Sequence, residues 1–158
     1  MTQPNLDFMQ AAIDLSLESI RTTHGGPYGA VVVKDGEIIG RGMNQVAPLN
    51  DPTAHAEMLA IRAACQHLQN WQLQGCELYT SCEPCPMCMA TIYWAKLDRI
   101  YYANSKEDAS EYGFNSGFIY QEIALPISQR SLPMTQLMQD KAVAAFKEWA
   151  SKTDKLTY

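Results

Sequence analysis

The chain has 158 residues, of which 47% are hydrophobic and 18% charged, and its formal net charge at pH 7 is −5. This length and composition are typical of one globular domain that can bury a sizeable core. Proteins that hold nucleic acid through its phosphates carry a basic excess, so the acidic balance argues against a nucleic-acid partner.

No apolar run approaches the roughly 20 residues that a membrane-spanning helix needs. The first residues lack a basic region followed by an apolar one, so we expect no secretory signal and no membrane partner. The five cysteines are an odd number, which argues against a disulfide framework. Together these features predict a cytoplasmic protein.

The first half of the chain predicts a helix followed by a hairpin. Apolar residues recur at helical spacing over residues 6–22, and the glycine- and proline-rich residues 24–27 end that helix. The β-rich runs 30–33 and 37–39 flank Asp35-Gly36, a dipeptide typical of a hairpin turn.

The second half alternates predicted helices and strands. In chain order we expect a loop at 50–53, a helix over 54–68, a strand at 76–80, a helix over 86–97, a strand at 99–103, a glycine-bearing loop at 109–118 and a helix over about 135–150. This alternation predicts an α/β domain with helices layered on a largely central sheet.

Two short motifs carry the chemistry. His55-Ala56-Glu57 and Cys85-Pro86-Met87-Cys88 supply three metal ligands (His55, Cys85 and Cys88) and one carboxylate. Structural zinc sites use four protein ligands, whereas three leave a position for a water whose pKa zinc lowers to about 7. The sequence therefore predicts one catalytic Zn²⁺ per subunit, with Glu57 as the general acid and base.

The spacing of His55 and Glu57 sets a geometric condition. Residues two apart diverge by about 200° on a regular helix, so we expect His55 in a frayed first turn where both side chains can converge. Cys82 repeats the spacing to Cys85 and could complete a closed, non-catalytic site. Its place at a predicted strand end favours a buried thiol instead, and Cys65 and Cys76 are expected in the core.

His-x-Glu followed by Pro-Cys-x-x-Cys is the signature of zinc nucleobase deaminases, so the chain resembles the cytidine deaminase-like superfamily. It is most similar to bacterial guanine deaminases of that fold. The segments that carry the similarity are residues 25–36, 50–57, 78–88, 92–95 and 118–123, and the terminal Tyr158. The resemblance implies a three-layer α/β/α fold with a central mixed sheet, a homodimer, and hydrolysis of a free purine base, guanine to xanthine plus ammonia.

The resemblance also implies a set of substrate-binding residues. They are Asn44, which would hydrogen-bond the base, Tyr28 and Trp94 in the pocket wall, Ala56, Asn115, Ser116, and Tyr158. Tyr158 would reach over the partner's site, within a segment of about 134–158 that subunits exchange. From the residues alone, Tyr28 and Trp94 equally fit core packing, Asn44 fits a turn, and the polar tail fits a frayed terminus.

One segment departs from the guanine deaminase pattern. Where those enzymes carry an acidic pair after Gly-Phe, this chain has Asn115-Ser116. A neutral serine is a weaker acceptor for two N–H groups. One alternative is that Asp108 or Glu111 accepts these hydrogen bonds in place of the missing acid. The other is that the substrate is another aminated heterocycle or nucleoside, such as cytosine, a pterin, an aminotriazine or guanosine. A tRNA adenosine deaminase is a further alternative, although the C-terminal helix shows no basic excess.

Overall fold

A computed structural model describes residues 3–23 and 25–157. The chain divides after Gly117 into two compact units, and each is described by itself. In the part of the chain that is described, no helix has the length and apolar character needed to cross a bilayer.

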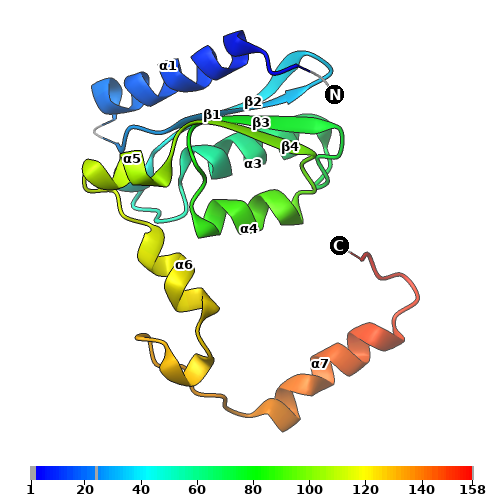
Figure 1. Ribbon diagram of the computed structural model, residues 1–158. Helices are drawn as coiled ribbons and strands as arrows, with labels where there is room; N and C mark the ends of the chain where they lie inside the picture. Colours follow the sequence, from blue (N-terminus) through cyan, green and yellow to red (C-terminus); the bar gives the residue numbers. More distant parts are fainter. Residues whose placement is uncertain (1–2, 24, 158) are drawn as a thin grey trace. The chain divides into compact units, whose positions relative to one another are not determined.

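The first unit is built on a mixed four-stranded sheet (Figure 1). Its strands are β1 (Gly29–Lys34), β2 (Glu37–Met43), β3 (Cys76–Cys82) and β4 (Arg99–Asn104), in the order β2-β1-β3-β4. β1 pairs antiparallel with β2 and β3, whereas β4 runs parallel to β3. The predicted hairpin is confirmed, and Asp35 and Gly36 both take positive φ angles, 50° and 82°.

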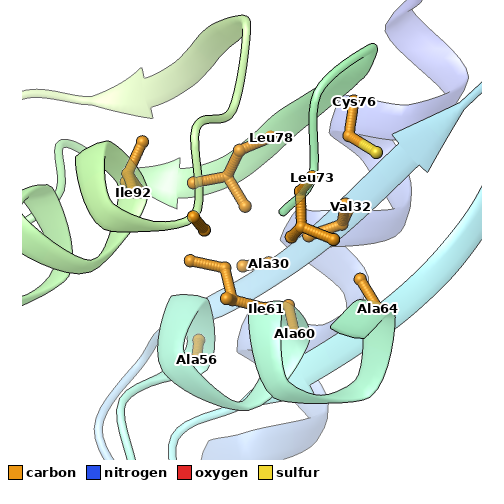
Figure 2. Close-up of a cluster of buried hydrophobic side chains, with 11 residues drawn as sticks. Ala30, Val32, Ala56, Ala60, Ile61, Ala64, Leu73, Cys76, Leu78 and Ile92 are labelled. Atoms are coloured by element: carbon orange, nitrogen blue, oxygen red, sulfur yellow. The ribbon is translucent and has the colours of Figure 1, made fainter. Parts of the chain in front are cut away.

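Helices cover both faces of this sheet. α1 (Leu6–Thr22) lies on one face, and α3 (Ala56–Leu68) and α4 (Pro86–Trp94) lie on the other (Figure 1). The larger core joins α3 and α4 to the sheet through small and aliphatic side chains, among them Ala56, Ala60, Leu78 and Ile92 (Figure 2). The predicted three-layer α/β/α fold is therefore confirmed.

Glycines in β2 let α3 approach the sheet closely. Gly40 and Gly42 are buried and face α3, where a Cβ on Gly42 would meet the backbone oxygen of Ala56 and a Cβ on Gly40 that of Ala60. The alanines of α3 at these contacts have short side chains, so the face of the helix toward β2 is flat as well. The first turn of α3 is thus fixed against β2 by backbone contact.

Several boundaries differ from the sequence prediction. α4 ends at Trp94 because Lys96 adopts a left-handed conformation (φ 57°), and α7 (Gln139–Ser151) begins after Met138, which does the same (φ 54°). The predicted loop at 109–118 instead contains the end of α5 (Lys106–Glu111) and the start of α6 (Gly117–Ala124). Short elements that periodicity did not reveal also include α2 (Val46–Leu49) and the 3₁₀ helix η1 (Ile127–Gln129).

The second unit, from Phe118 onward, has no core of its own. None of its described residues is buried, although α6 and α7 carry large apolar side chains such as Phe118, Phe146 and Trp149. Local polar contacts hold its central turn: Ser131 donates to Glu122 from both its backbone N–H and its hydroxyl, each at 2.8 Å. That residues 1–158 form one domain, whose segment of about 134–158 is exchanged between subunits, stays a prediction.

Candidate active site

Three predicted ligands come together at the starts of two helices. His55 is the N-cap of α3 and Cys85 the N-cap of α4, both with extended backbone, and Cys88 lies in the first turn of α4. The Nδ1 atom of His55 lies 3.6 Å from the sulfur of Cys85 and 3.6 Å from that of Cys88, and the sulfurs are 3.6 Å apart. Among the described residues these three form the group able to hold a metal ion.

These distances can be compared with those of a zinc site. In a tetrahedral site with Zn–S of about 2.3 Å and Zn–N of about 2.0 Å, two sulfurs lie about 3.8 Å apart, and a sulfur and a nitrogen about 3.5 Å apart. The separations of 3.6 Å fit this geometry without rearrangement. Two sulfurs and one imidazole are also the donors that zinc prefers, and they leave one position open.

The electrostatics of the three side chains favour a cation. The pKa of Cys85 is lowered to about 4, because Cys88 and then His55 hydrogen-bond to its sulfur. The same bond to Cys85, together with burial, raises the pKa of Cys88, and the bond with Cys85 raises the pKa of His55. Cys85 is therefore stabilised as a thiolate by its neighbours, and a divalent cation at the site would stabilise both sulfurs as thiolates.

Glu57 lies beside the ligands with its carboxyl group buried. It is 5% exposed in the first turn of α3, and burial is the main cause that raises its pKa. Its carboxyl group also hydrogen-bonds with Cys88, and this bond lowers the pKa of Glu57 in part. His55 precedes the helix and Glu57 belongs to it, so the two side chains converge as the sequence required. A buried carboxyl next to metal ligands is suited to proton transfer.

Asn44 follows β2 and is 7% exposed. Its Oδ1 accepts hydrogen bonds from the backbone N–H groups of Gly26 and Val46, both at 3.3 Å. Two donors aimed at one atom require an oxygen there, so the orientation of the amide is fixed. The Nδ2 group is left to donate to a ligand.

Two aromatic rings lie next to this region. Tyr28 is half-buried, and its ring meets that of Phe114 edge to face, with centroids 5.4 Å apart and an interplanar angle of 86°. Burial raises the pKa of the Tyr28 phenol, and the nearby acidic groups of Cys82 and Glu57 add to this effect. Phe114 was missed by the sequence reasoning; the available signal was a single aromatic residue after a loop glycine.

The remaining candidates are dispersed. Ala56 is buried between His55 and Glu57, whereas Trp94 is the last residue of α4, 62% exposed and at the opposite end of that helix from the ligands. Tyr158 lies outside the described residues. The roles of Ala56, Trp94 and Tyr158 in substrate binding stay predictions.

The polar side chains in and before the loop that follows α5 make local hydrogen bonds. Asn115 is exposed and its Oδ1 accepts from the N–H of Gly117 at 2.9 Å, while Ser116 is half-buried. Asp108 accepts from the backbone N–H and hydroxyl of Ser105, at 2.7 and 2.8 Å, in a capping box. The structure therefore gives Asp108 a helix-capping role, and Glu111 is exposed at the end of α5.

Cys82 is buried outside the group of metal ligands. Its Sγ donates to the backbone oxygen of Ser105 at 3.6 Å, and burial raises its pKa to about 11. A neutral thiol with its own acceptor agrees with the structural role expected for this residue.

Known proteins with similar sequences and structures include zinc-binding deaminases. Residues 2–104 match the family model described as the cytidine and deoxycytidylate deaminase zinc-binding region. Guanine deaminase of Bacillus subtilis (strain 168) is 47% identical over 151 residues, which cover 96% of this chain and 97% of that protein. The X-ray structure of guanine deaminase from Bacillus subtilis matches with a TM-score of 0.95, at 46% identity and 99% coverage of both chains.

More distant relatives match less completely. A structure of guanine deaminase from Nitrosomonas europaea has a TM-score of 0.68 at 28% identity, and the match covers 94% of this chain and 85% of that one. The tRNA-specific adenosine deaminase of Aquifex aeolicus is 48% identical over 77 residues, which are 49% of this chain and 51% of that protein. Similarity to these guanine deaminases extends over at least 94% of this chain, whereas similarity to this tRNA deaminase covers about half of it.

Proposed function

The chain belongs to the cytidine and deoxycytidylate deaminase zinc-binding family and within it to the guanine deaminases, and on that premise we propose that it hydrolyses guanine to xanthine and ammonia. The observation that carries this function is the Cys₂His site with the buried Glu57 beside it, in a chain similar to a guanine deaminase over 96% of its length. The enzyme is a zinc-dependent hydrolase.

The side chains divide the reaction between them. His55, Cys85 and Cys88 would hold the zinc ion, which would lower the pKa of a water molecule to about 7. Glu57 accepts a proton from the attacking water and delivers it to the ring nitrogen beside the carbon that bears the amine. As the water oxygen bonds to that carbon and the carbon–nitrogen bond breaks, Glu57 passes the second water proton to the amino group, which leaves as ammonia.

We propose that Asn44 orients the base. Because its Oδ1 is occupied by two backbone donors, its Nδ2 group donates to an acceptor atom on the purine. Tyr28, supported by Phe114, forms an aromatic wall next to Glu57. Asn115 and Ser116 form a neutral edge where related guanine deaminases are acidic, so we expect weaker discrimination there between guanine and other aminated rings.

We propose that the active form is a homodimer with exchanged C-terminal segments. The support is that α6 and α7 expose apolar side chains and bury none, so they need a covering surface. The experiment mixes Glu57→Gln subunits, which keep their tails, with subunits truncated before residue 152. Activity restored in the refolded mixture supports exchange, whereas an inactive mixture of dimers contradicts it.

We propose a reducing, cytoplasmic location. Two thiolate ligands at the site require reduced sulfur, and cytosolic thiols are kept reduced. Oxidation of Cys85 and Cys88 in the purified protein should release zinc, which a colorimetric zinc assay would detect.

An ammonia-release panel tests the substrate. It comprises guanine, guanosine, adenine, cytosine, isocytosine and a pterin, with Glu57→Gln as the inactive control. We expect guanine to give the highest kcat/KM. If guanine is inert and another ring reacts, the proposed substrate is wrong while the zinc chemistry stands.

A further inference from the structure

The loop before the zinc ligand His55 is held by a carboxylate. Asp51 accepts two hydrogen bonds at one oxygen, Oδ1, from the backbone N–H of Thr53 at 2.8 Å and from its hydroxyl at 2.7 Å. This closes a tight turn just before α3, and the N–H of Ala54 donates back to the Asp51 carbonyl at 3.0 Å.

A side chain from α3 completes the arrangement. Nη2 of Arg62 donates to the hydroxyl oxygen of Thr53 at 3.1 Å, and its Nη1 lies 3.9 Å from the Asp51 carboxylate. Arg62 is two helical turns beyond His55, so it links the loop to the helix that the loop precedes. The side chains of Arg62 and Asp51 are 47% and 37% exposed, so the ion pair alone contributes little and the hydrogen bonds to Thr53 matter more.

This network is connected to His55 through the backbone. The N–H of His55 donates to the Thr53 carbonyl at 2.8 Å, and the His55 carbonyl accepts from Leu59 at 3.0 Å. Among the described residues, the hydrogen bonds of the His55 ring go to the two thiols from Nδ1, and no protein acceptor meets the second ring nitrogen. Metal-binding histidines are usually oriented through that second nitrogen. Here the backbone of residues 53–55 has to set the direction of the ring.

We propose that Asp51, Thr53 and Arg62 form a positioning unit for His55, with Asp51 as its principal member. This inference rests on the proposed function only in requiring that the site bind zinc. Asp51 acts through Thr53 and does not touch the metal or the substrate. Loss of its carboxylate should loosen the turn, displace the His55 ring and weaken zinc binding.

The test compares Asp51→Ala with Asp51→Asn, which keeps an oxygen that can accept both bonds from Thr53. Zinc affinity is measured by competition with a chromophoric chelator, and ligand geometry by the visible absorption of the Co²⁺-substituted protein. We expect Asp51→Ala to lower zinc affinity by about 10- to 100-fold and to alter the Co²⁺ spectrum. Asp51→Asn should stay within about three-fold of the wild-type affinity, since its amide retains the acceptor.

Glu122→Ala is the matched control. Glu122 also accepts from the N–H and the hydroxyl of one residue, Ser131, but it lies in the second unit. Its loss should leave zinc affinity unchanged. If Asp51→Ala does not fold, Thr53→Val against Thr53→Ser makes the same comparison, because only serine keeps the hydroxyl link.

The outcomes separate the two proposals. Wild-type zinc affinity and an unchanged Co²⁺ spectrum in Asp51→Ala, or in Thr53→Val, would overturn the positioning role. A wild-type protein that binds zinc but releases no ammonia from guanine would contradict the proposed substrate, while leaving the zinc measurements valid. Equal loss of affinity in Asp51→Ala and Glu122→Ala would also count against the role, because it would reflect general destabilisation.

Discussion

Replacing Gly42 by alanine should damage catalysis through the position of α3. A Cβ at this site would overlap the Ala56 backbone oxygen and lie 2.6 Å from the Ala60 nitrogen and 3.0 Å from the Leu59 Cβ, where ordinary contact begins at 3.4 Å. These neighbours are backbone or helix-anchored atoms, so the first turn of α3 must move by about 1 Å. A displacement of about 1 Å in catalytic groups costs about 100-fold in rate. We expect kcat/KM to fall about 100-fold and stability by about 1–3 kcal/mol.

Gly40→Ala is the matched control for this prediction. Its Cβ would meet the next turn of α3, at the Ala60 oxygen and at the Ala64 nitrogen, 2.9 Å away. We expect a similar loss of stability in chemical unfolding, but a smaller loss of kcat/KM and of zinc affinity. If folded Gly42→Ala retains wild-type kcat/KM, or if both variants lose activity equally, the claim that this contact positions His55 and Glu57 is refuted.

Three further predictions use other parts of the site. Glu57→Gln should retain zinc in a stoichiometry assay but lose turnover by at least about 100-fold, since proton transfer by a side chain contributes about 10²–10⁴-fold; near-normal kcat would remove Glu57 from the mechanism. Phe114→Ala should raise KM for guanine more than it lowers kcat, because the ring supports Tyr28 and not the reacting atoms; an unchanged KM would contradict the aromatic wall. Asp108→Asn should lower the free energy of unfolding in urea at pH 7, and the difference should shrink as pH falls below about 3.8 and vanish once pH is below the lowered pKa of Asp108. The sign follows because hydrogen bonds from Ser105 lower the pKa of Asp108 from 3.8, so its contribution is present above that value and is lost as pH falls through the lowered pKa. A difference that persists in acid would contradict it.

The elements that carry the chemistry could be predicted from the sequence because strong local signals define them. Asp35-Gly36 specifies the hairpin, and the ligand motifs stand where loops or strands give way to helices. Residues 106–111 could not be found in this way, because one turn and a half of helix is too short for periodicity. The capping box of Ser105 and Asp108 stabilises it instead.

The ligand set was more predictable than the pocket around it. His55, Cys85 and Cys88 are recognisable from residue type and spacing, and the structure brings them within reach of one another. The Tyr28–Phe114 contact joins residues from distant loops, and no local pattern encodes it. The same holds for Gly42, whose importance depends on which helix lies across β2.

The three metal ligands and Glu57 all lie before residue 105, and the match to the zinc-binding family ends at residue 104. The loop with Asn115 and Ser116 follows that point and supplies none of the metal ligands, so we expect changes in this loop to alter base preference more than zinc binding. Such a division lets a lineage exchange one substrate for another by altering peripheral segments while inheriting the hydrolytic apparatus intact. It also gives protein engineers a boundary: grafting residues 105–158 from a relative should alter base preference in part, since Asn44 and Tyr28 stay with the recipient, and should keep the zinc ligands in place.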